Sequence, residues 1–297
     1  MTFPYRNEAF WGEKRAQLAE QGYTVIESVV PASLRQASID AICDFMAVDL
    51  KDRRTWYKDD PINDSGSVPM HHHPAFWQVR QHPDIYHAFA KVLEEEKLWV
   101  TMDRASFKPP CRYDLEQYGN DQNRMHWDYD FRKLDEPVYQ GLIYLTDTEK
   151  SQGAFGGLPQ VYRQIANNTF HDPELFDKFT INGLYLEEVY KFTEEDITRI
   201  DAPAGSLVIF DSRLPHGNVC THHFDPRFVQ FIAMYKAGST RHVPEVLHQS
   251  REERINCYES SRPPAWLRGW RGQLDPEPFK PAELSPLGKK LVGLEPW

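Results

Sequence analysis

The sequence lacks a run of about 18 apolar residues, the length that crosses a bilayer as a helix, so we expect no membrane span. It also lacks internal repeats and low-complexity tracts. Positive charge is scarce, because 34 Lys and Arg stand against 44 Asp and Glu, giving a net charge of -10. This balance argues against nucleic acid as a partner, since nucleic-acid-binding domains usually carry a basic surface. The first eight residues include an acid and no apolar core, so they do not predict a signal peptide.

Cysteine is rare as well, with four residues and no Cys-X-X-Cys pair. Widely separated cysteines in a chain of this length are typical of reduced thiols in an intracellular protein. We therefore expect a cytoplasmic location and four free thiols, at Cys43, Cys111, Cys220 and Cys257.

What the chain does have is enough apolar sequence for a substantial core, 40% of 297 residues. We expect one domain over residues 1–297. Its first part, 1–96, predicts a helical flank with a first strand: helices over 8–21, 32–48 and 83–95, and a strand over 23–28. Short strands with Gly and Pro turns follow, over 98–102, 124–131, 138–146, 206–210 and 228–235.

Helices followed by short strands predict an α+β protein that is mainly β with a helical flank. We expect a double-stranded β-helix (jelly roll, cupin-like) over 97–240, interrupted by a helical insertion at about 160–201. Residues 241–297 form a C-terminal extension rich in Pro and Trp. Tryptophans need burial, so this extension is expected to wrap the domain or to contact a second subunit, and a monomer and a homodimer are both open.

The tripeptide His126-Trp127-Asp128 is the strongest chemical signal. Residues two apart on a strand share a face, so His126 and Asp128 can converge on one ion. A distant histidine, His216, follows strand 206–210, and a jelly roll can bring it across from the first pair. Two imidazoles and one carboxylate can hold one face of Fe(II) and leave three positions open. His-X-Asp is common by chance, so the tripeptide alone is weak evidence.

Arg227 opens an otherwise apolar strand, eleven residues after His216. A guanidinium in such a strand is costly unless it is paired, and it can grip a carboxylate through two N–H groups. A structural salt bridge to one of the acidic residues is the alternative. The triplet His71-His72-His73, beside Pro74, reads as a surface or substrate-loop segment and not as a metal site. We expect His222 and His223 to be solvated turn residues before Pro226, with support of His216 as the alternative.

Together these motifs resemble the phytanoyl-CoA dioxygenase family of Fe(II)/2-oxoglutarate-dependent oxygenases. The resemblance covers roughly residues 10–240 and rests on His126-Trp127-Asp128, on the run from Gly205-Ser206 through Asp211-Ser212 to His216, on Arg227, and on the opening Leu18 to Ile26. One departure is visible. The family often has a Gly-Ser-His turn in the middle of the barrel, where this chain has Gly157-Leu158-Pro159. That difference concerns the substrate side of the pocket and not the metal.

The resemblance implies roles for named residues. His126, Asp128 and His216 would bind iron and carry the catalysis, and Arg227 would bind the distal carboxylate of 2-oxoglutarate. Three polar residues fall where family members contact the co-substrate, although each could equally be ordinary lining of the barrel: Asn123, Tyr144 and Asn218. Three basic residues are candidates for a polar or anionic substrate, with a solvated edge as the alternative for the first two: Arg104, Lys108 and, if strand 124–131 continues, Arg132.

The resemblance also implies the reaction. Fe(II), 2-oxoglutarate and O2 would oxidise, most simply hydroxylate, an unactivated C–H bond of a small molecule, with release of succinate and CO2. Asp128 argues against halogenation, because related halogenases have a small residue at that position. Two alternatives stay open: a zinc-dependent hydrolase or lyase on the same three ligands, and a non-catalytic jelly-roll binding module whose histidines are structural. The acidic composition makes a CoA ester a less attractive substrate.

Overall fold

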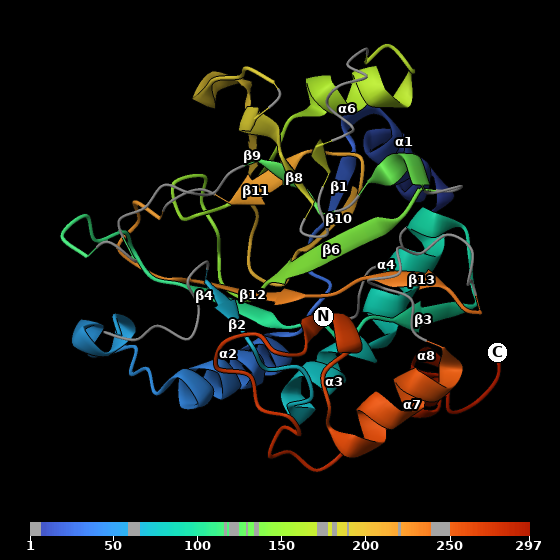
Figure 1. Cartoon of the computed structure of the whole chain (residues 1–297). Coiled ribbons are helices and arrows are strands. Elements are labelled where there is room, and N and C mark those ends of the chain that lie inside the picture. The colour runs from blue at the N-terminus through green and yellow to red at the C-terminus, as the bar shows by residue number, and fades with distance from the viewer. Residues whose placement is uncertain are drawn as a thin grey trace.

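The computed structural model describes residues 7–58, 66–115, 118, 125–128, 130–133, 137–170, 178–179, 183–188, 190–218, 221–238 and 250–297. Two antiparallel sheets face each other, the smaller above the larger in Figure 1. The larger sheet has the order β1 (Tyr23–Ile26), β10 (Leu207–Asp211), β6 (Tyr139–Tyr144), β12 (Arg227–Phe231), β4 (Ala105–Lys108) and β2 (Ser67–Val68). The smaller has the order β8 (Leu184–Tyr185), β5 (His126–Trp127), β11 (His216–Asn218), β7 (Phe155–Gly157) and β9 (Thr198–Ile200).

The path of the chain through these sheets is that of a double-stranded β-helix. From β4 to β7 and again from β9 to β12, each successive strand lies in the other sheet. The two sheets stay separate, so the architecture is an open jelly roll and not a closed barrel. A further pair, β3 (Leu98–Val100) and β13 (Met234–Lys236), lies outside both sheets. The predicted jelly roll with a helical flank is thereby confirmed.

Alternation along the strands of the larger sheet creates two apolar layers. One set of side chains points between the sheets and packs with Phe155 and Ile200 of the smaller sheet: Leu142, Tyr144, Val208, Phe210 and Val229. The intervening residues point the other way and pack with the helices: Ile143, Leu207, Ile209 and Phe228. The interior of the jelly roll is therefore walled by β6, β10 and β12.

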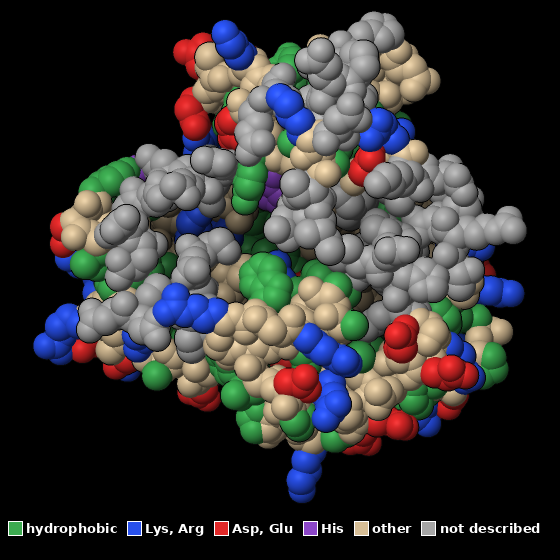
Figure 2. Space-filling model, in the orientation of Figure 1, with side chains coloured by type: hydrophobic (Ala, Val, Ile, Leu, Met, Phe, Trp, Pro, Cys, Tyr) green, Lys and Arg blue, Asp and Glu red, His purple; other side chains and the backbone are tan. Residues whose placement is uncertain are grey.

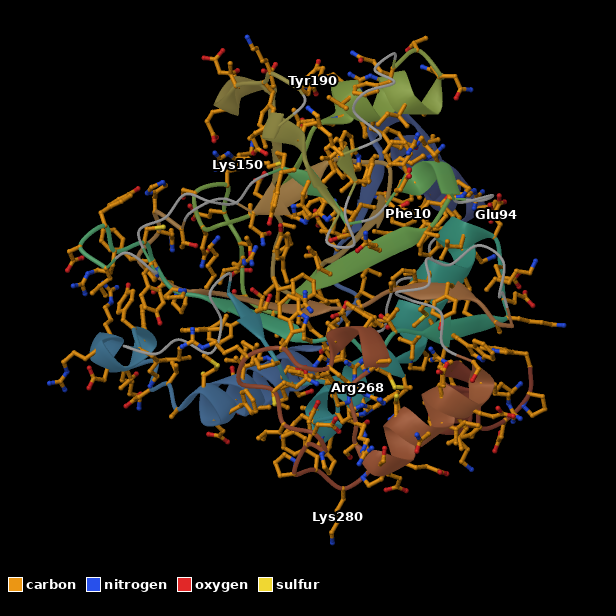
Figure 3. The ribbon with its side chains drawn as sticks, in the orientation of Figure 1. Phe10, Glu94, Lys150, Tyr190, Arg268 and Lys280 are labelled. Carbon is orange, nitrogen blue, oxygen red and sulfur yellow. The ribbon has the colours of Figure 1, made fainter. Side chains whose placement is uncertain are left out.

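Helices cover the outer face of the larger sheet: α1 (Glu8–Gln21), α2 (Ala32–Met46), α3 (Pro74–Arg80) and α4 (Pro83–Leu93). The side chain of Asn7 accepts a hydrogen bond from Phe10 N–H to begin α1, and Gly22, at φ +79°, ends it in the left-handed region. Phe10 of α1 and Glu94, just after α4, lie on the same flank in Figure 3. Arg15 of α1 donates to the Lys91 carbonyl of α4 at 3.1 Å. The other helices are α6 (Pro159–Ala166), α7 (Arg251–Ser260) and α8 (Pro286–Val292), with 3-10 turns at Arg53–Trp56, Phe131–Lys133, Leu186–Glu188, Glu194–Asp196 and Ala265–Leu267.

The C-terminal extension packs on this same helical layer. Arg254 of α7 is buried, and its guanidinium donates to the carbonyls of Val100, Leu291 and Val292. At the end of the chain, the indole N–H of Trp297 donates to the Leu98 carbonyl at 2.9 Å. The extension therefore closes against its own domain.

Several local predictions were wrong. Within the predicted strand 124–131 the described strand is β5, and beyond it the Asp130 carboxylate accepts the backbone N–H of Arg132 at 3.1 Å, in a turn that leads into a 3-10 helix. Residues 74–80, for which no helix was predicted, form α3, since the His73 ring caps a helix that has Pro74 in its first turn. The insertion predicted to be helical contains α6 but also strands β8 and β9.

The expectation of four free thiols was also wrong, because Cys111 is disulfide-bonded, whereas Cys43 and Cys257 are free. The cytoplasmic location, which rested on those thiols, stays a prediction. No helix in the described part of the chain combines the length and the apolar character needed to cross a bilayer.

Two residues of the histidine triplet, His71 and His72, lie inside the protein, and His73 is half-buried. His71 and His72 are each 1% exposed, and their backbone N–H groups donate to the carboxylate of Glu277 at 2.8–3.0 Å. Glu277 belongs to the C-terminal extension and is itself buried. Burial raises the pKa of Glu277 to about 7, although the two N–H donors and Arg80 act in the opposite direction. This carboxyl therefore connects the C-terminal extension to the segment that precedes α3 in the sequence.

We predict that Glu277 makes the protein less stable as pH rises. The pKa of Glu277 is about 7 in the folded protein and near 4.5 in the unfolded chain, so folding favours the protonated carboxyl. The stability that this carboxyl contributes is therefore lost as the pH rises from about 4.5 to about 7. From pH of about 5 to about 8, the free energy of unfolding of wild type should fall by roughly 1–3 kcal/mol relative to that of Glu277→Gln. Urea unfolding across the range measures this difference.

Comparison with the variant is needed because burial lowers the pKa of His71 and His72 and gives a pH dependence of opposite sign. Glu259→Gln, an exposed change on α7, is the control and should follow the wild-type curve. A difference between wild type and Glu277→Gln that does not vary with pH would contradict the prediction.

Candidate metal centre

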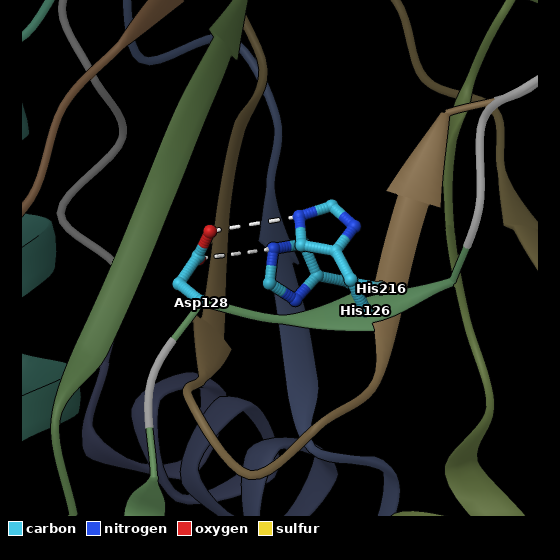
Figure 4. Close-up of side chains that lie close together, drawn as sticks. All are labelled: His126, Asp128 and His216. Carbon is cyan, nitrogen blue, oxygen red and sulfur yellow. Dashed lines mark ion pairs between the residues drawn. The ribbon is translucent and has the colours of Figure 1, made fainter. Parts of the chain in front are cut away.

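Pairing of β5 with β11 brings the predicted ligands together. His126 and His216 are direct partners across these antiparallel strands, and Asp128 follows the end of β5. The Nε2 atom of His126 lies 3.5 Å from Oδ1 of Asp128, and Nε2 of His216 lies 3.4 Å from Oδ2 (Figure 4). All three ligand atoms lie within 4.8 Å of one another. The spacing of two residues and the distant histidine thus meet at one point.

The ring of His216 is held in one tautomer. Its Nδ1 atom lies 3.0 Å from the carbonyl oxygen of Leu214, and a carbonyl only accepts, so Nδ1 carries the proton. The lone pair is therefore on Nε2, the atom that faces Asp128. Phe155 stacks on the ring at 5.7 Å between centroids, and Phe210 lies at 4.6 Å. This histidine is pre-oriented as a ligand before any ion binds.

The site has one closed and one open side. The His216 side chain is 9% exposed, whereas that of Asp128 is 42% exposed. Figure 2 shows histidine at the bottom of a hollow in this face, with hydrophobic and Lys or Arg side chains near its rim. Small molecules can therefore approach the three ligands from the Asp128 side.

Asp128 is held as an anion. Burial raises the pKa of Asp128, but hydrogen bonds and positive charge from the two imidazoles in their protonated form (the neutral rings are the metal ligands) outweigh it and keep the pKa well below its usual value. The side-chain amide of Gln140, on β6, donates to Oδ2 at 2.9 Å and fixes the orientation of the carboxylate. Two nitrogen donors with one anionic oxygen, fixed by neighbouring groups, form the donor set of non-haem Fe(II) sites that keep positions open for other ligands.

Arg227 is the second element of the site. It is completely buried on β12 and donates to the Asn218 side chain at 2.9 Å, to the Ser106 hydroxyl at 3.1 Å and to the Gly153 carbonyl. Its Nε–H has no acceptor, and no carboxylate among the described residues pairs with it. Burial lowers the pKa of Arg227 to about 10, which leaves the group charged at neutral pH. A buried cation without an anion is a ready binding group for one.

The contact with Asn218 places this guanidinium on the metal side of the jelly roll. Asn218 lies two residues beyond His216 on β11, so the two side chains share a face about 7 Å apart. Asn218, predicted to contact the co-substrate, is thus a link between His216 and Arg227.

The other predicted residues have different surroundings. The hydroxyl of Tyr144 donates to the Ile200 carbonyl and accepts from Phe155 N–H, so it joins β6 to the smaller sheet. Arg132 is not on the face of His126 and Asp128, because it turns back onto the Asp130 carboxylate at 2.7 Å. Lys108 pairs with Arg227 across β4 and β12, and Arg104 precedes β4. Asn123 lies outside the described residues.

Sequence reasoning missed Gln140, which the alternation of 138–146 could have revealed. Residues 140, 142 and 144 share the interior face of β6, and an amide in that row is unexpected unless it has a polar partner. The Leu214 carbonyl carries no signal in a side-chain pattern, so its part in holding His216 could not be foreseen.

Comparisons with known proteins agree with this geometry. The model of the phytanoyl-CoA dioxygenase (PhyH) family matches residues 18–218. A Dictyostelium discoideum protein named for the same family is 25% identical over 283 residues, covering 79% of this chain and 77% of the relative.

Solved structures share the fold. GlcNAc-inducible GIG2 (DUF1479) from Candida albicans has a TM-score of 0.67 at 16% identity, covering 95% of this chain and 76% of that one. The epimerase SnoN, solved with Fe3+, alpha-ketoglutarate and nogalamycin RO, has a TM-score of 0.55 at 12% identity and covers 94% of this chain and 97% of its own. The family match spans more than half of the chain and includes all three candidate ligands. The resemblance seen in the sequence is thus confirmed, and the chain belongs to the phytanoyl-CoA dioxygenase family.

Proposed function

We propose that this protein is an Fe(II)- and 2-oxoglutarate-dependent dioxygenase that hydroxylates an unactivated C–H bond of a small molecule and releases succinate and CO2. The observation that carries the proposal is the combination of a His-Asp-His cluster on one sheet with the buried Arg227 on the facing sheet, which pairs with no carboxylate among the described residues. A zinc hydrolase would use the three ligands but has no need of such a guanidinium. A binding module with structural histidines has no need of an open side at Asp128.

Each residue has a distinct role in this proposal. His126, His216 and Asp128 would hold Fe(II), and Asp128 offsets part of its charge. Iron with 2-oxoglutarate and O2 supplies the oxidising power. Arg227 would bind the distal carboxylate of 2-oxoglutarate through its remaining N–H donors, with Asn218 and Ser106 keeping the guanidinium in place. Phe155 and Phe210, packed on His216, exclude water from the closed side.

The deciding experiment measures succinate formation and O2 uptake by the purified protein with Fe(II), with Zn2+ and without metal. We expect turnover of 2-oxoglutarate with Fe(II) but not with Zn2+ or without metal, and the turnover should be slow when no substrate is added. His126→Ala should lose this turnover, because a metal ligand has been removed. His222→Ala, an exposed turn change, is the control and should retain it. Turnover that survives in His126→Ala, or succinate formation with Zn2+, would refute the iron assignment.

A second prediction concerns Arg227. Replacing it with Gln removes the charge that would pair with the co-substrate, and a hydrogen bond to a charged group contributes about 1.5–3 kcal/mol. We therefore expect Arg227→Gln to raise KM for 2-oxoglutarate by about 10- to 100-fold with a smaller effect on kcat. Steady-state kinetics at saturating Fe(II) measure both constants, and Arg54→Gln, exposed and paired with Asp52, should match wild type. An unchanged KM would assign Arg227 to structure alone.

A third prediction concerns Gln140. Without its hydrogen bond the Asp128 carboxylate loses its fixed orientation, so Gln140→Leu should weaken Fe(II) binding or activity by about 10- to 100-fold. Iron titration followed by dialysis measures the affinity, and Gln36→Leu, exposed on α2, is the matched control. If iron affinity and activity both stayed at wild-type values, Gln140 would have no part in the metal site.

A further inference from the structure

A second arginine faces the interior of the jelly roll. Phe231 N–H donates to the Arg104 carbonyl at 3.1 Å and extends the pairing of β12 with β4 by one residue. Opposed residues of antiparallel strands share a face, so Arg104 lies on the side of Phe231. Arg227 is on that same side, four residues earlier on β12. Arg104 and Arg227 are therefore set along one interior surface.

The guanidinium of Arg104 is built into a definite position. It lies 4.0 Å from the ring centroid of Trp270, a cation–π contact with an indole from the C-terminal extension. Its Nε and Nη1 atoms are shielded from solvent and have no hydrogen-bond acceptor among the residues that the structure describes. Stacking on an aromatic face fixes the plane of a guanidinium while its N–H edges stay available. Buried, charged donors without an acceptor are costly, so this position favours an anionic ligand.

Trp270 is presented by a tight turn. Gly269 and Gly272 on either side have φ of +83° and +73°, and Gln273 N–H donates to the Trp270 carbonyl at 3.1 Å. The indole is 45% exposed, although large aromatic side chains in this protein are mostly buried. In Figure 3, Arg268, two residues earlier, lies over the lower helical layer, whereas Lys280 extends from the lower edge of the molecule. The turn thus brings an apolar surface next to Arg104.

This pair lies on the open side of the metal ligands. Phe231, beside Arg104, is opposite Leu142 on β6, and Gln140, two residues before Leu142, donates to Asp128. The neighbouring Asp103 carboxylate accepts the backbone N–H of Arg104 at 2.7 Å. Burial raises the pKa of Asp103, the charge of Arg104 lowers it, and the charge of Asp128 adds to the rise. Arg104 is therefore on the side from which a substrate reaches the ligands.

We propose that Arg104, stacked on Trp270, binds a carboxylate group of the substrate, so that the substrate is a small carboxylic acid with an apolar body resting on the indole. This proposal rests on the proposed function and names its substrate class. A single negative charge suits the pocket, because the carboxylates of Asp103 and Asp128 are close and would repel a phosphate dianion. The alternative is that Arg104 only anchors the C-terminal turn.

The test uses equilibrium binding, which does not need turnover. The probes are phenylacetate, 3-phenylpropanoate and 4-phenylbutanoate, each beside its neutral amide and each measured by quenching of tryptophan fluorescence and by calorimetry. We expect wild type to bind at least one acid about tenfold or more tightly than its amide. Arg104→Gln should lose that preference, because it should weaken binding of the acid by about 10- to 100-fold and change binding of the amide little. Arg104→Lys should restore part of it, because it keeps the charge.

Two further variants separate binding from anchoring. Arg271→Gln, exposed and adjacent to Trp270, is the matched control and should bind like wild type. Trp270→Leu removes the surface under the guanidinium and should weaken acid and amide alike. Thermal melting shows whether each variant is folded, and if Arg104→Gln fails to fold, Arg104→Lys and Trp270→Leu decide the question.

Three outcomes would overturn the proposal. Wild type could show no preference for any acid over its amide. Folded Arg104→Gln could keep the preference, which would leave Arg104 an anchor only. Arg104→Gln could weaken binding of 2-oxoglutarate instead of the probes, which would assign it to the co-substrate. Because these are binding measurements on the metal-free protein, they are independent of the succinate assay that tests the proposed function.

Discussion

The antiparallel contact between β5 and β11 is the constraint on which the site depends. It sets His126 directly opposite His216. Asp128 is the first residue after the end of β5, and from there its carboxylate reaches both imidazoles. Such a contact between segments so distant in sequence requires the alternation of the chain between two sheets. The fold therefore creates the metal site by topology, and neighbouring groups such as Gln140 and the Leu214 carbonyl fix orientation within it.

Buried arginines show how one residue type serves two purposes here. Arg254 uses all three guanidinium nitrogens on partners in the segments that it joins, so it is a structural clamp. Arg227 and Arg104 each keep shielded nitrogen atoms without an acceptor. A buried Nε atom without a partner also occurs in Arg35 and Arg80, so it is the position of Arg227 and Arg104 on the interior face of the jelly roll that favours ligands as the explanation of their unpaired nitrogens.

Much of the scaffold was predictable because its signals are local. Gly22 marks the end of α1, and a short apolar run rich in β-forming residues indicates β6. The triad was predictable because a two-residue spacing fixes a face. Arg132 was misplaced because the Asp130 turn competes with the strand, and the roles of Glu277 and Trp270 depend on contacts across more than 150 residues, which no local pattern encodes.

The interior face of β4 and β12 suggests how two anionic molecules can bind in one pocket beside the metal ligands without competing for the same arginine. Arg227 pairs with Lys108, whereas Arg104 precedes β4, so their backbone positions are four strand residues, about 13 Å, apart along the strands. Co-substrate and substrate would each be held at its own position along this face, and the ligand cluster belongs to the opposite sheet. Since Trp270 comes from the C-terminal extension and not from the jelly roll, the substrate end can vary in sequence while the metal and the co-substrate end stay unchanged.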